Sequence, residues 1–176
     1  GEVLQLLNAR NTSITEEQYL DVIYRKTARL FEAAGQLGAI LAGADEATSR
    51  AIGNYGKHLG TAFQLVDDVL DYSGDVEQLG KNLGDDLSEG KPTLPLIHAM
   101  RQGTPEQARV VREAIETDGR DGLERVLSAI QAARSLEYTQ AQARASADRA
   151  LACLNTIAPS KYRECLCDLA RFSVER

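Results

Sequence analysis

Three closely spaced aspartates are the first residues in this 176-residue chain that could do chemistry. They are Asp67, Asp68 and Asp71, in the order Asp-Asp-Val-Leu-Asp, and Gln64 precedes them by about one helical turn. At about 100° per residue, these four side chains share one arc of about 100° on an α-helix. Mg²⁺ prefers oxygen ligands and commonly binds one or two carboxylates together with substrate phosphates. The pattern therefore predicts a magnesium site that faces a phosphorylated ligand.

A solvated acidic face is the other interpretation, because an amphipathic helix turns its polar residues toward water. The opposite side of this helix is apolar, with Leu59, Ala62, Phe63, Val66, Val69 and Leu70. Like charges four residues apart, however, destabilise a helix by about 0.2–0.5 kcal/mol. Gly53, Gly56 and Gly60 lie on the acidic arc, and each costs a helix about 0.5–1 kcal/mol relative to alanine. These glycines predict that a ligand or another backbone comes close.

A lysine and a threonine form the second feature, Lys26 and Thr27 in Tyr-Arg-Lys-Thr-Ala. Helical periodicity predicts Thr27 at the centre of a buried stripe and Lys26 at its edge. The apolar residues of that stripe are Leu20, Ile23, Tyr24, Phe31, Ala34 and Leu41. The pair would supply a cation and a hydroxyl donor to a phosphate. Alternatively, Thr27 is a core residue and Lys26 extends its charge to solvent.

A glycine- and lysine-rich segment is the third feature, and residues 74–91 are predicted to form one long loop. Loops of that length inside a compact domain are usually functional. Glycines let backbone amides approach an anion, and Lys81 and Lys91 could neutralise phosphate oxygens. The spacing does not match a P-loop, and a solvated loop is the alternative interpretation.

Helix signals dominate the rest of the chain and predict an all-α fold. Thr15 to Gln18 form a capping box that opens a helix, and Asp45 can cap the next one. The predicted helices span about 15–43, 45–73, 122–133, 135–154 and 160–174, and two more begin near Pro95 and Thr104. No stretch approaches the ~18–20 apolar residues that span a bilayer. Residues 1–13 show no helix cap and suggest a fragment of a longer protein.

Charge and cysteine content narrow the possible functions. The 20 basic and 26 acidic residues give a formal charge of −6, which argues against general nucleic-acid binding. The three cysteines suggest neither a disulfide framework nor a zinc site. Reduced thiols in a cytoplasmic protein are the simplest interpretation.

Taken together, the three features resemble trans-isoprenyl diphosphate synthases in order and spacing, and most of all the long-chain, octaprenyl-type bacterial enzymes. The resemblance extends through Phe-Ser-Val-Glu-Arg at 172–176. It implies an isoprenoid-synthase helical bundle around a deep cavity, usually a homodimer. It also implies an enzyme that uses Mg²⁺ to condense isopentenyl diphosphate with an allylic diphosphate.

The resemblance assigns roles residue by residue. The metal ligands are the three aspartates Asp67, Asp68 and Asp71. The residues assigned to the allylic diphosphate are Lys26, Thr27, Gln64, Lys81 and Lys91. Lys26, Asp67 and Asp68 are also assigned to catalysis, and Asp85 and Asp86 to support of the loop.

The departure from the family is the absence of its first aspartate-rich motif, of the arginines that follow it and of the basic residues that bind isopentenyl diphosphate. Residues 1–176 are therefore expected to be the C-terminal part of a polyprenyl synthetase domain, inactive alone. The alternatives are a non-catalytic helical subunit or interaction partner of such an enzyme, and an acidic helical scaffold. Terpene cyclases share the bundle but typically lack the Lys-Thr pair and this loop. The expectation of an octaprenyl product, rather than a shorter one, rests on overall similarity to the long-chain enzymes.

Overall fold

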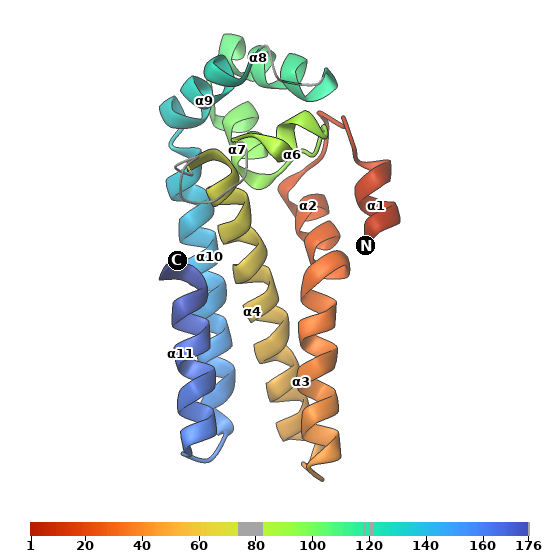
Figure 1. Cartoon of the computed structure of the whole chain (residues 1–176), viewed down its shortest axis with the longest axis vertical. Helices are drawn as coiled ribbons and strands as arrows, with labels where there is room; N and C mark the ends of the chain where they lie inside the picture. The colour runs from red at the N-terminus through yellow and green to blue at the C-terminus, as the bar shows by residue number, and fades with distance from the viewer. Residues whose placement is uncertain (74–82, 118, 120–121, 176) are drawn as a thin grey trace. The chain divides into compact units, whose positions relative to one another are not determined.

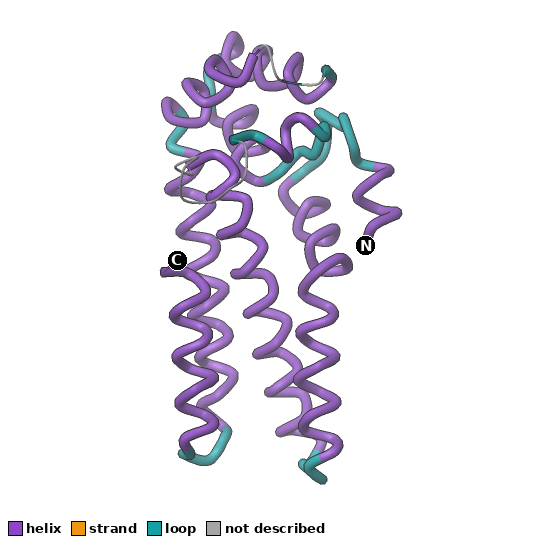
Figure 2. The backbone as a smooth tube through the Cα atoms, in the orientation of Figure 1, coloured by secondary structure: helices purple, strands orange, loops and turns teal. Residues whose placement is uncertain are grey.

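The chain is all-α in the computed structural model, which describes residues 1–73, 83–117, 119 and 122–175 (Figures 1 and 2). Helix is the only regular secondary structure in these residues, which confirms the predicted fold class. In the same described ranges, no helix has the combination of length and apolar character needed to cross a bilayer.

The described helices follow one another along the chain with the labels of Figure 1. They are α1 (Glu2–Leu7), α2 (Glu16–Ile23), the π-helix η1 (Tyr24–Ala28), α3 (Arg29–Leu41), α4 (Glu46–Ser73), α6 (Asp85–Ser88), α7 (Leu94–Gln102), α8 (Pro105–Glu116), α9 (Leu123–Ala132), α10 (Ser135–Cys153), the 3₁₀ helix η3 (Leu154–Thr156) and α11 (Lys161–Glu175).

The helices fall into two compact units. The first unit contains residue 1, 23–66 and 141–176, and the second contains 2–22 and 67–140. Two long helices, α4 and α10, contribute residues to both units.

Local capping explains where several helices begin. Thr15 Oγ1 accepts a hydrogen bond from the Gln18 amide at 3.2 Å, and the Gln18 side chain accepts one from the Thr15 amide at 2.9 Å. Asp45 caps α4 by accepting from the Thr48 amide at 2.7 Å. Such bonds satisfy amides that the first helical turn leaves without partners. The predicted capping sites are therefore confirmed.

The predicted stripe around Thr27 is wrong in its C-terminal part. Ala34 is exposed and Leu41 is 87% exposed. The cause is the π-helical segment Tyr24–Ala28, whose i→i+5 bonding inserts an extra residue into the turn. The 3.6-residue period that predicted the stripe is out of phase beyond this segment.

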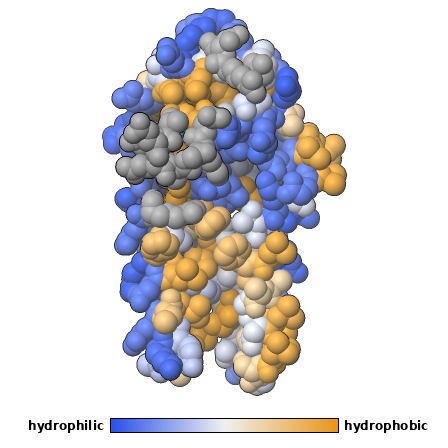
Figure 3. Space-filling view, viewed as in Figure 1, coloured by the Kyte–Doolittle hydropathy of each residue, from blue (hydrophilic) through white to orange (hydrophobic). Residues whose placement is uncertain are grey.

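One side of α3 consequently presents large apolar side chains at the surface. Leu30, Leu37 and Ile40 are 70%, 59% and 61% exposed. Figure 3 shows hydrophobic surface gathered over this helix.

The predicted loop at residues 74–91 is also wrong in part, because α6 lies within it. Gly84 precedes α6 with φ 77°, and Gly90 follows it with φ 71°. Both values lie in the left-handed region that glycine adopts without steric cost. Residues 74–82, with Gly80 and Lys81, lie outside the described residues.

The glycines of α4 bring it close to η1 and α3 in the first unit (Figure 1). A Cβ atom added at Gly60 would lie 2.7 Å from the Ala28 Cα, and one added at Gly53 would lie 2.6 Å from the Gln36 Cγ. These distances are shorter than ordinary van der Waals contact. Of the two explanations for the glycines, close approach of another backbone therefore applies at Gly60.

Gly60→Ala is expected to destabilise the fold by about 1–3 kcal/mol, because the added methyl group would overpack a backbone contact. Gly38→Ala is the matched control. Gly38 is also helical and exposed, and no atom of the described residues, apart from its chain neighbours and its own helix backbone, lies within 4 Å of an added Cβ. It should gain about 0.5–1 kcal/mol from helix propensity. Urea unfolding measures both effects, and equal effects of the two substitutions would contradict the packing explanation.

Polar contacts within the second unit join α2, α7 and α10. Tyr138 donates a hydrogen bond to the Glu16 carboxylate, at 2.9 and 3.0 Å from its two oxygens. Arg101 lies 3.5 Å from the same carboxylate. His98 stacks on Tyr138 with 4.1 Å between ring centroids, and its Nδ1 lies 3.0 Å from Ser135 Oγ. This arrangement fixes the start of α2.

The stability that the two histidines contribute to the fold is expected to fall as pH falls from about 7.5 to 6. Burial, and then Arg101, lower the pKa of His98 although Glu16 opposes the shift. Burial also lowers the pKa of His58, with further contributions from Arg149 and Lys57. The native state binds these protons less tightly than the unfolded chain does. The stabilisation that the two neutral histidines contribute is therefore present above the unfolded pKa of about 6.5 and is lost below it.

Urea midpoints at the two pH values measure this dependence. The double variant His58→Gln/His98→Gln should lose less stability than the parent chain when the pH falls between them. An unchanged pH slope in that variant would show that other groups are responsible.

Candidate functional site

Asp68 is buried in the second unit and contacts a tyrosine of α2. Asp68 is only 1% exposed, and the Tyr19 hydroxyl donates a hydrogen bond to its Oδ2 atom. Burial, and then the charge of Asp68, raise the pKa of Tyr19 well above its usual value. The phenol therefore remains a neutral donor. A fully solvated acidic face, the alternative interpretation of the aspartates, is wrong for Asp68.

Asp71 lies one turn later and is half-buried. Its Oδ2 accepts a hydrogen bond from the Asp86 amide at 3.2 Å, and its backbone carbonyl accepts one from Gly84 at 2.9 Å. Burial, and then the Asp86 charge, raise the pKa of Asp71 to about 6. Crowding of carboxylates raises a pKa in this way, and a nearby cation would reverse the effect.

The aspartates fit a divalent cation in chemistry but do not form a preformed cage. Among the described residues, no group of three His, Cys, Asp or Glu side chains is arranged to hold a metal ion. Mg²⁺ does not require such a cage, because it commonly takes one or two carboxylates and completes its shell with water and phosphate. Half-buried Asp67 and Asp71 and buried Asp68 offer oxygen donors only. The three-aspartate metal site stays a prediction.

Lys91 is held by the acids of the segment that precedes it. Its Nζ lies 3.0 Å from Asp86 Oδ1 and 2.6 Å from Glu89 Oε2. Burial opposes the charge, but the two carboxylates outweigh it and raise the pKa of Lys91. Asp86 thus supports this part of the segment, as predicted. The assignment of Lys91 to a diphosphate stays a prediction, and Lys81 lies outside the described residues.

Asp85 and Asp86, which the resemblance assigns to support of the loop, belong to a second acidic group, whose third member Glu89 was missed from the sequence. Asp85, Asp86 and Glu89 repeat the spacing of the three aspartates of α4. Asp86 and Glu89 bind Lys91, so these acids already have a cationic partner. In the sequence, the nearby Lys91 was the signal that could have indicated this pairing of acids with a cation.

The first unit brings together two residues assigned to the diphosphate. Thr27 Oγ1 donates a hydrogen bond to Gln64 Oε1 at 3.0 Å, across 37 residues of sequence. Both side chains are half-buried, as is Lys26. Thr27 therefore bonds a side chain of α4, and its assignment to a diphosphate stays a prediction.

Lys26 and Thr27 both lie in the π-helix η1. Short π-helical segments are rare and occur frequently at functional sites. The segment is fixed at its first residue, because the Tyr24 hydroxyl donates to Glu32 at 2.8 Å and Lys57 Nζ lies 5.0 Å from the centroid of the Tyr24 ring. The widened turn thus has a defined place in the first unit.

Tyr19 is a site residue that sequence reasoning missed. A buried tyrosine normally needs a polar partner for its hydroxyl, and Tyr19 is 4% exposed. That rule predicts some partner, but no spacing rule identifies Asp68, which lies 49 residues away in the sequence.

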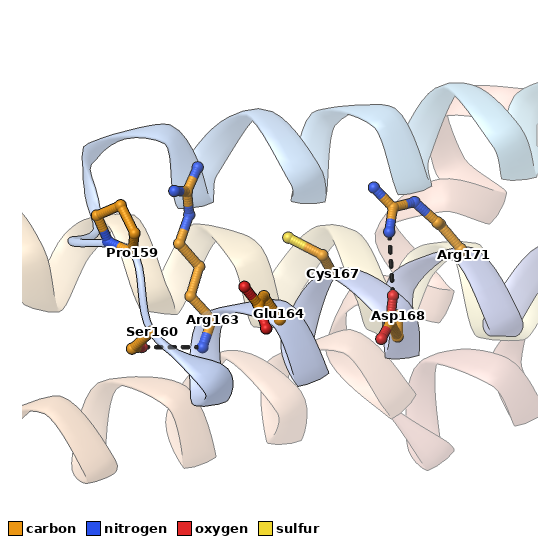
Figure 4. A pocket seen from close by; sticks show the side chains of 7 residues that line it. All are labelled: Pro159, Ser160, Arg163, Glu164, Cys167, Asp168 and Arg171. Carbon is orange, nitrogen blue, oxygen red and sulfur yellow. Dashed lines mark hydrogen bonds and ion pairs between the residues drawn. The ribbon is translucent and has the colours of Figure 1, made fainter.

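A surface pocket of about 390 Å³ lies along α11 in the first unit (Figure 4). Its walls come from Pro159, Ser160 and one face of α11. Figure 4 shows Arg171 bonded to Asp168, and the two side chains are 3.0 Å apart. Among the described residues, none that is predicted to bind metal or diphosphate lines this pocket.

Known proteins match the chain over its whole length. The model of a family described as polyprenyl synthetase matches residues 1–133. Octaprenyl diphosphate synthase of Escherichia coli (strain K12) is 56% identical over 177 residues, which cover 100% of this chain and 55% of that protein. The all-trans-nonaprenyl-diphosphate synthase (geranyl-diphosphate specific) of Rhodobacter capsulatus is 44% identical and is covered to 54%.

Solved structures agree with these matches. A polyprenyl synthase from Caulobacter crescentus CB15, complexed with calcium and isoprenyl diphosphate, superposes with a TM-score of 0.92 at 42% identity. That match covers 99% of this chain and 54% of the other. The chain thus spans about half the length of the relatives it matches. It belongs to the polyprenyl synthetase family.

Proposed function

We propose that this chain is the C-terminal part of a prenyltransferase that condenses isopentenyl diphosphate with an allylic diphosphate to make a long-chain all-trans polyprenyl diphosphate. Such a product would serve as a quinone side-chain precursor. The observation that carries the proposal is the burial of Asp68 on the acidic side of α4. A helix that presents three acids to water would leave this carboxylate exposed.

The aspartates would hold the divalent cation, which we propose to be Mg²⁺. When bound, the cation would draw negative charge from the diphosphate leaving group and so favour its departure. The complex of the related Caulobacter enzyme with calcium and isoprenyl diphosphate supports this pairing of a divalent cation with a diphosphate. Asp67, Asp68 and Asp71 would supply the carboxylate oxygens, with Asp67 as a direct ligand.

Lys26, Thr27 and Gln64 would bind the allylic diphosphate. Lys26 would contribute a positive charge, and the Thr27 hydroxyl would turn its single proton from Gln64 Oε1 to a phosphate oxygen. The Thr27–Gln64 hydrogen bond of 3.0 Å supports this proposal, because it places two polar side chains assigned to the diphosphate next to each other.

Lys81 and Lys91 would add further positive charge against the diphosphate. Lys91 is bound to Asp86 and Glu89, so it would have to exchange one of these acids for a phosphate oxygen. Lysine binds phosphate as a point charge, so a phosphate oxygen can take the place of a carboxylate oxygen.

We further propose that the full-length enzyme is a cytoplasmic homodimer. The resemblance implies a homodimer, and the cysteine content favours a cytoplasmic location. The resemblance also implies two Asp-Asp-x-x-Asp motifs in a complete enzyme, of which the 176-residue chain contains one, at 67–71. Light scattering of the full-length protein tests the dimer, and cell fractionation tests the location.

Calorimetric titration of the chain with inorganic pyrophosphate tests the proposed function. Heat of binding should appear with Mg²⁺ present and should disappear with EDTA. A non-catalytic helical subunit or interaction partner would bind no pyrophosphate under either condition, and that result would overturn the proposal.

A further inference from the structure

We infer that Tyr19 is a positioning residue that orients the Asp68 carboxylate toward the divalent cation. The inference rests on the proposed function and concerns residues of the second unit alone. Tyr19 lies on α2 and Asp68 on α4, and the tyrosine hydroxyl donates to Asp68 Oδ2. The two residues are 4% and 1% exposed.

The hydrogen bond limits the orientation of the carboxylate. The terminal torsion of an aspartate is broad and roughly two-fold, so the plane of a carboxylate is poorly fixed by its own rotamer. A donor that holds Oδ2 removes this freedom and directs Oδ1. Groups that orient a metal ligand in this way typically affect metal affinity by about 10–100-fold.

The phenol is a suitable donor because it is neutral. A lysine or arginine in its place would cancel the negative charge of Asp68 and compete with a divalent cation for it. Tyr19 satisfies one lone pair of the buried carboxylate and adds no positive charge.

The position of Tyr19 is itself fixed by the start of α2. Glu16 lies one turn earlier, and its carboxylate accepts from the Tyr138 hydroxyl at 2.9 and 3.0 Å and lies 3.5 Å from Arg101. The capping box at Thr15 holds the same turn. Rigid support of this kind is what a precisely oriented ligand requires.

The affinity of the chain for Mn²⁺ in the presence of inorganic pyrophosphate, measured by electron paramagnetic resonance, tests the inference. Tyr19→Phe should weaken Mn²⁺ binding by about 10-fold or more. Tyr55→Phe is the matched control. Tyr55 is also 4% exposed, and its hydroxyl donates a hydrogen bond to the Leu166 carbonyl at 2.8 Å in the first unit. The control substitution removes this bond. Its Mn²⁺ affinity should stay within about 2-fold of the parent chain.

A double-mutant cycle separates positioning from a general loss of stability. In an Asp68→Asn background, Tyr19→Phe should cost no further Mn²⁺ affinity, because the group that it orients has lost its charge. A purely structural tyrosine would cause the same loss in both backgrounds, and that result would overturn the inference.

Loss of the fold is controlled by circular dichroism. If Tyr19→Phe loses its helical signal, Tyr138→Phe replaces it as the test, because it releases Glu16 and loosens α2 without altering Tyr19 or Asp68. Mn²⁺ affinity should then fall by about 3-fold or more, and an unchanged affinity would overturn the inference.

The outcomes also distinguish this inference from the proposed function. If the parent chain binds no Mn²⁺ with pyrophosphate, the proposed function fails and Tyr19 has no site to position. If the parent chain binds Mn²⁺ and Tyr19→Phe binds it equally well, the positioning role alone fails.

Discussion

Asp67→Asn is expected to weaken Mg²⁺-linked pyrophosphate binding by about 100-fold or more, equivalent to about 2.7 kcal/mol. The substitution keeps the size of the side chain but removes the negative charge that a hard cation requires. Because Mg²⁺ would join Asp67 to the pyrophosphate, loss of the metal ligand should also remove most of the anion binding. Calorimetry with Mg²⁺ in excess measures the effect.

Asp168→Asn is the control for a general change of charge. Asp168 is an exposed aspartate of α11 that binds Arg171 at 3.0 Å, and it lies outside the proposed machinery. Its substitution should leave pyrophosphate affinity unchanged. The acidic-scaffold interpretation makes the opposite prediction for Asp67→Ala, namely unchanged affinity and a more stable helix, because repulsion between like charges would be relieved.

Prenyl transfer should be absent from this chain alone and should appear when the missing half is supplied. In a condensation assay with labelled isopentenyl diphosphate, the 176 residues should give no product above background. Joining them to the N-terminal part of the related Escherichia coli enzyme should restore turnover. The missing aspartate-rich motif and the residues that bind isopentenyl diphosphate would then be present.

The control is the same fusion with Asp67→Asn, which should stay inactive. Robust turnover by the isolated chain would contradict the proposal that it carries only part of the machinery. A fusion that folds but shows no turnover would favour the non-catalytic interpretation instead.

Local features of the fold could be predicted from the sequence because their causes are local. The capping boxes at Thr15 and Thr104 set helix starts through bonds between residues three apart. Pro95 lies in the first turn of α7, where its missing amide costs nothing. Fold class follows from helix propensity and periodicity summed along the chain.

Features that depend on tertiary contacts or on a change of helical period could not be predicted. The π-helix at Tyr24–Ala28 has no simple composition signal, and it shifts the phase of every later residue of that helical run. The exposure of Leu41 is the consequence.

The candidate site divides in the same way. The spacing of Asp67, Asp68 and Asp71 on one helical arc could be predicted, because helix geometry alone determines it. The burial of Asp68 could not, because it depends on Tyr19 of a different helix. The Thr27–Gln64 hydrogen bond likewise depends on packing between η1 and α4.

The central claim is that the aspartates of α4 hold a divalent cation against a diphosphate. A crystal structure of the chain with Mn²⁺ and inorganic pyrophosphate tests it most directly, because anomalous scattering locates the metal. The account predicts an anomalous peak about 2.1 Å from an Asp67 carboxylate oxygen, with a pyrophosphate oxygen in the same coordination shell. A peak elsewhere on the surface, with pyrophosphate bound away from all three aspartates, would contradict it.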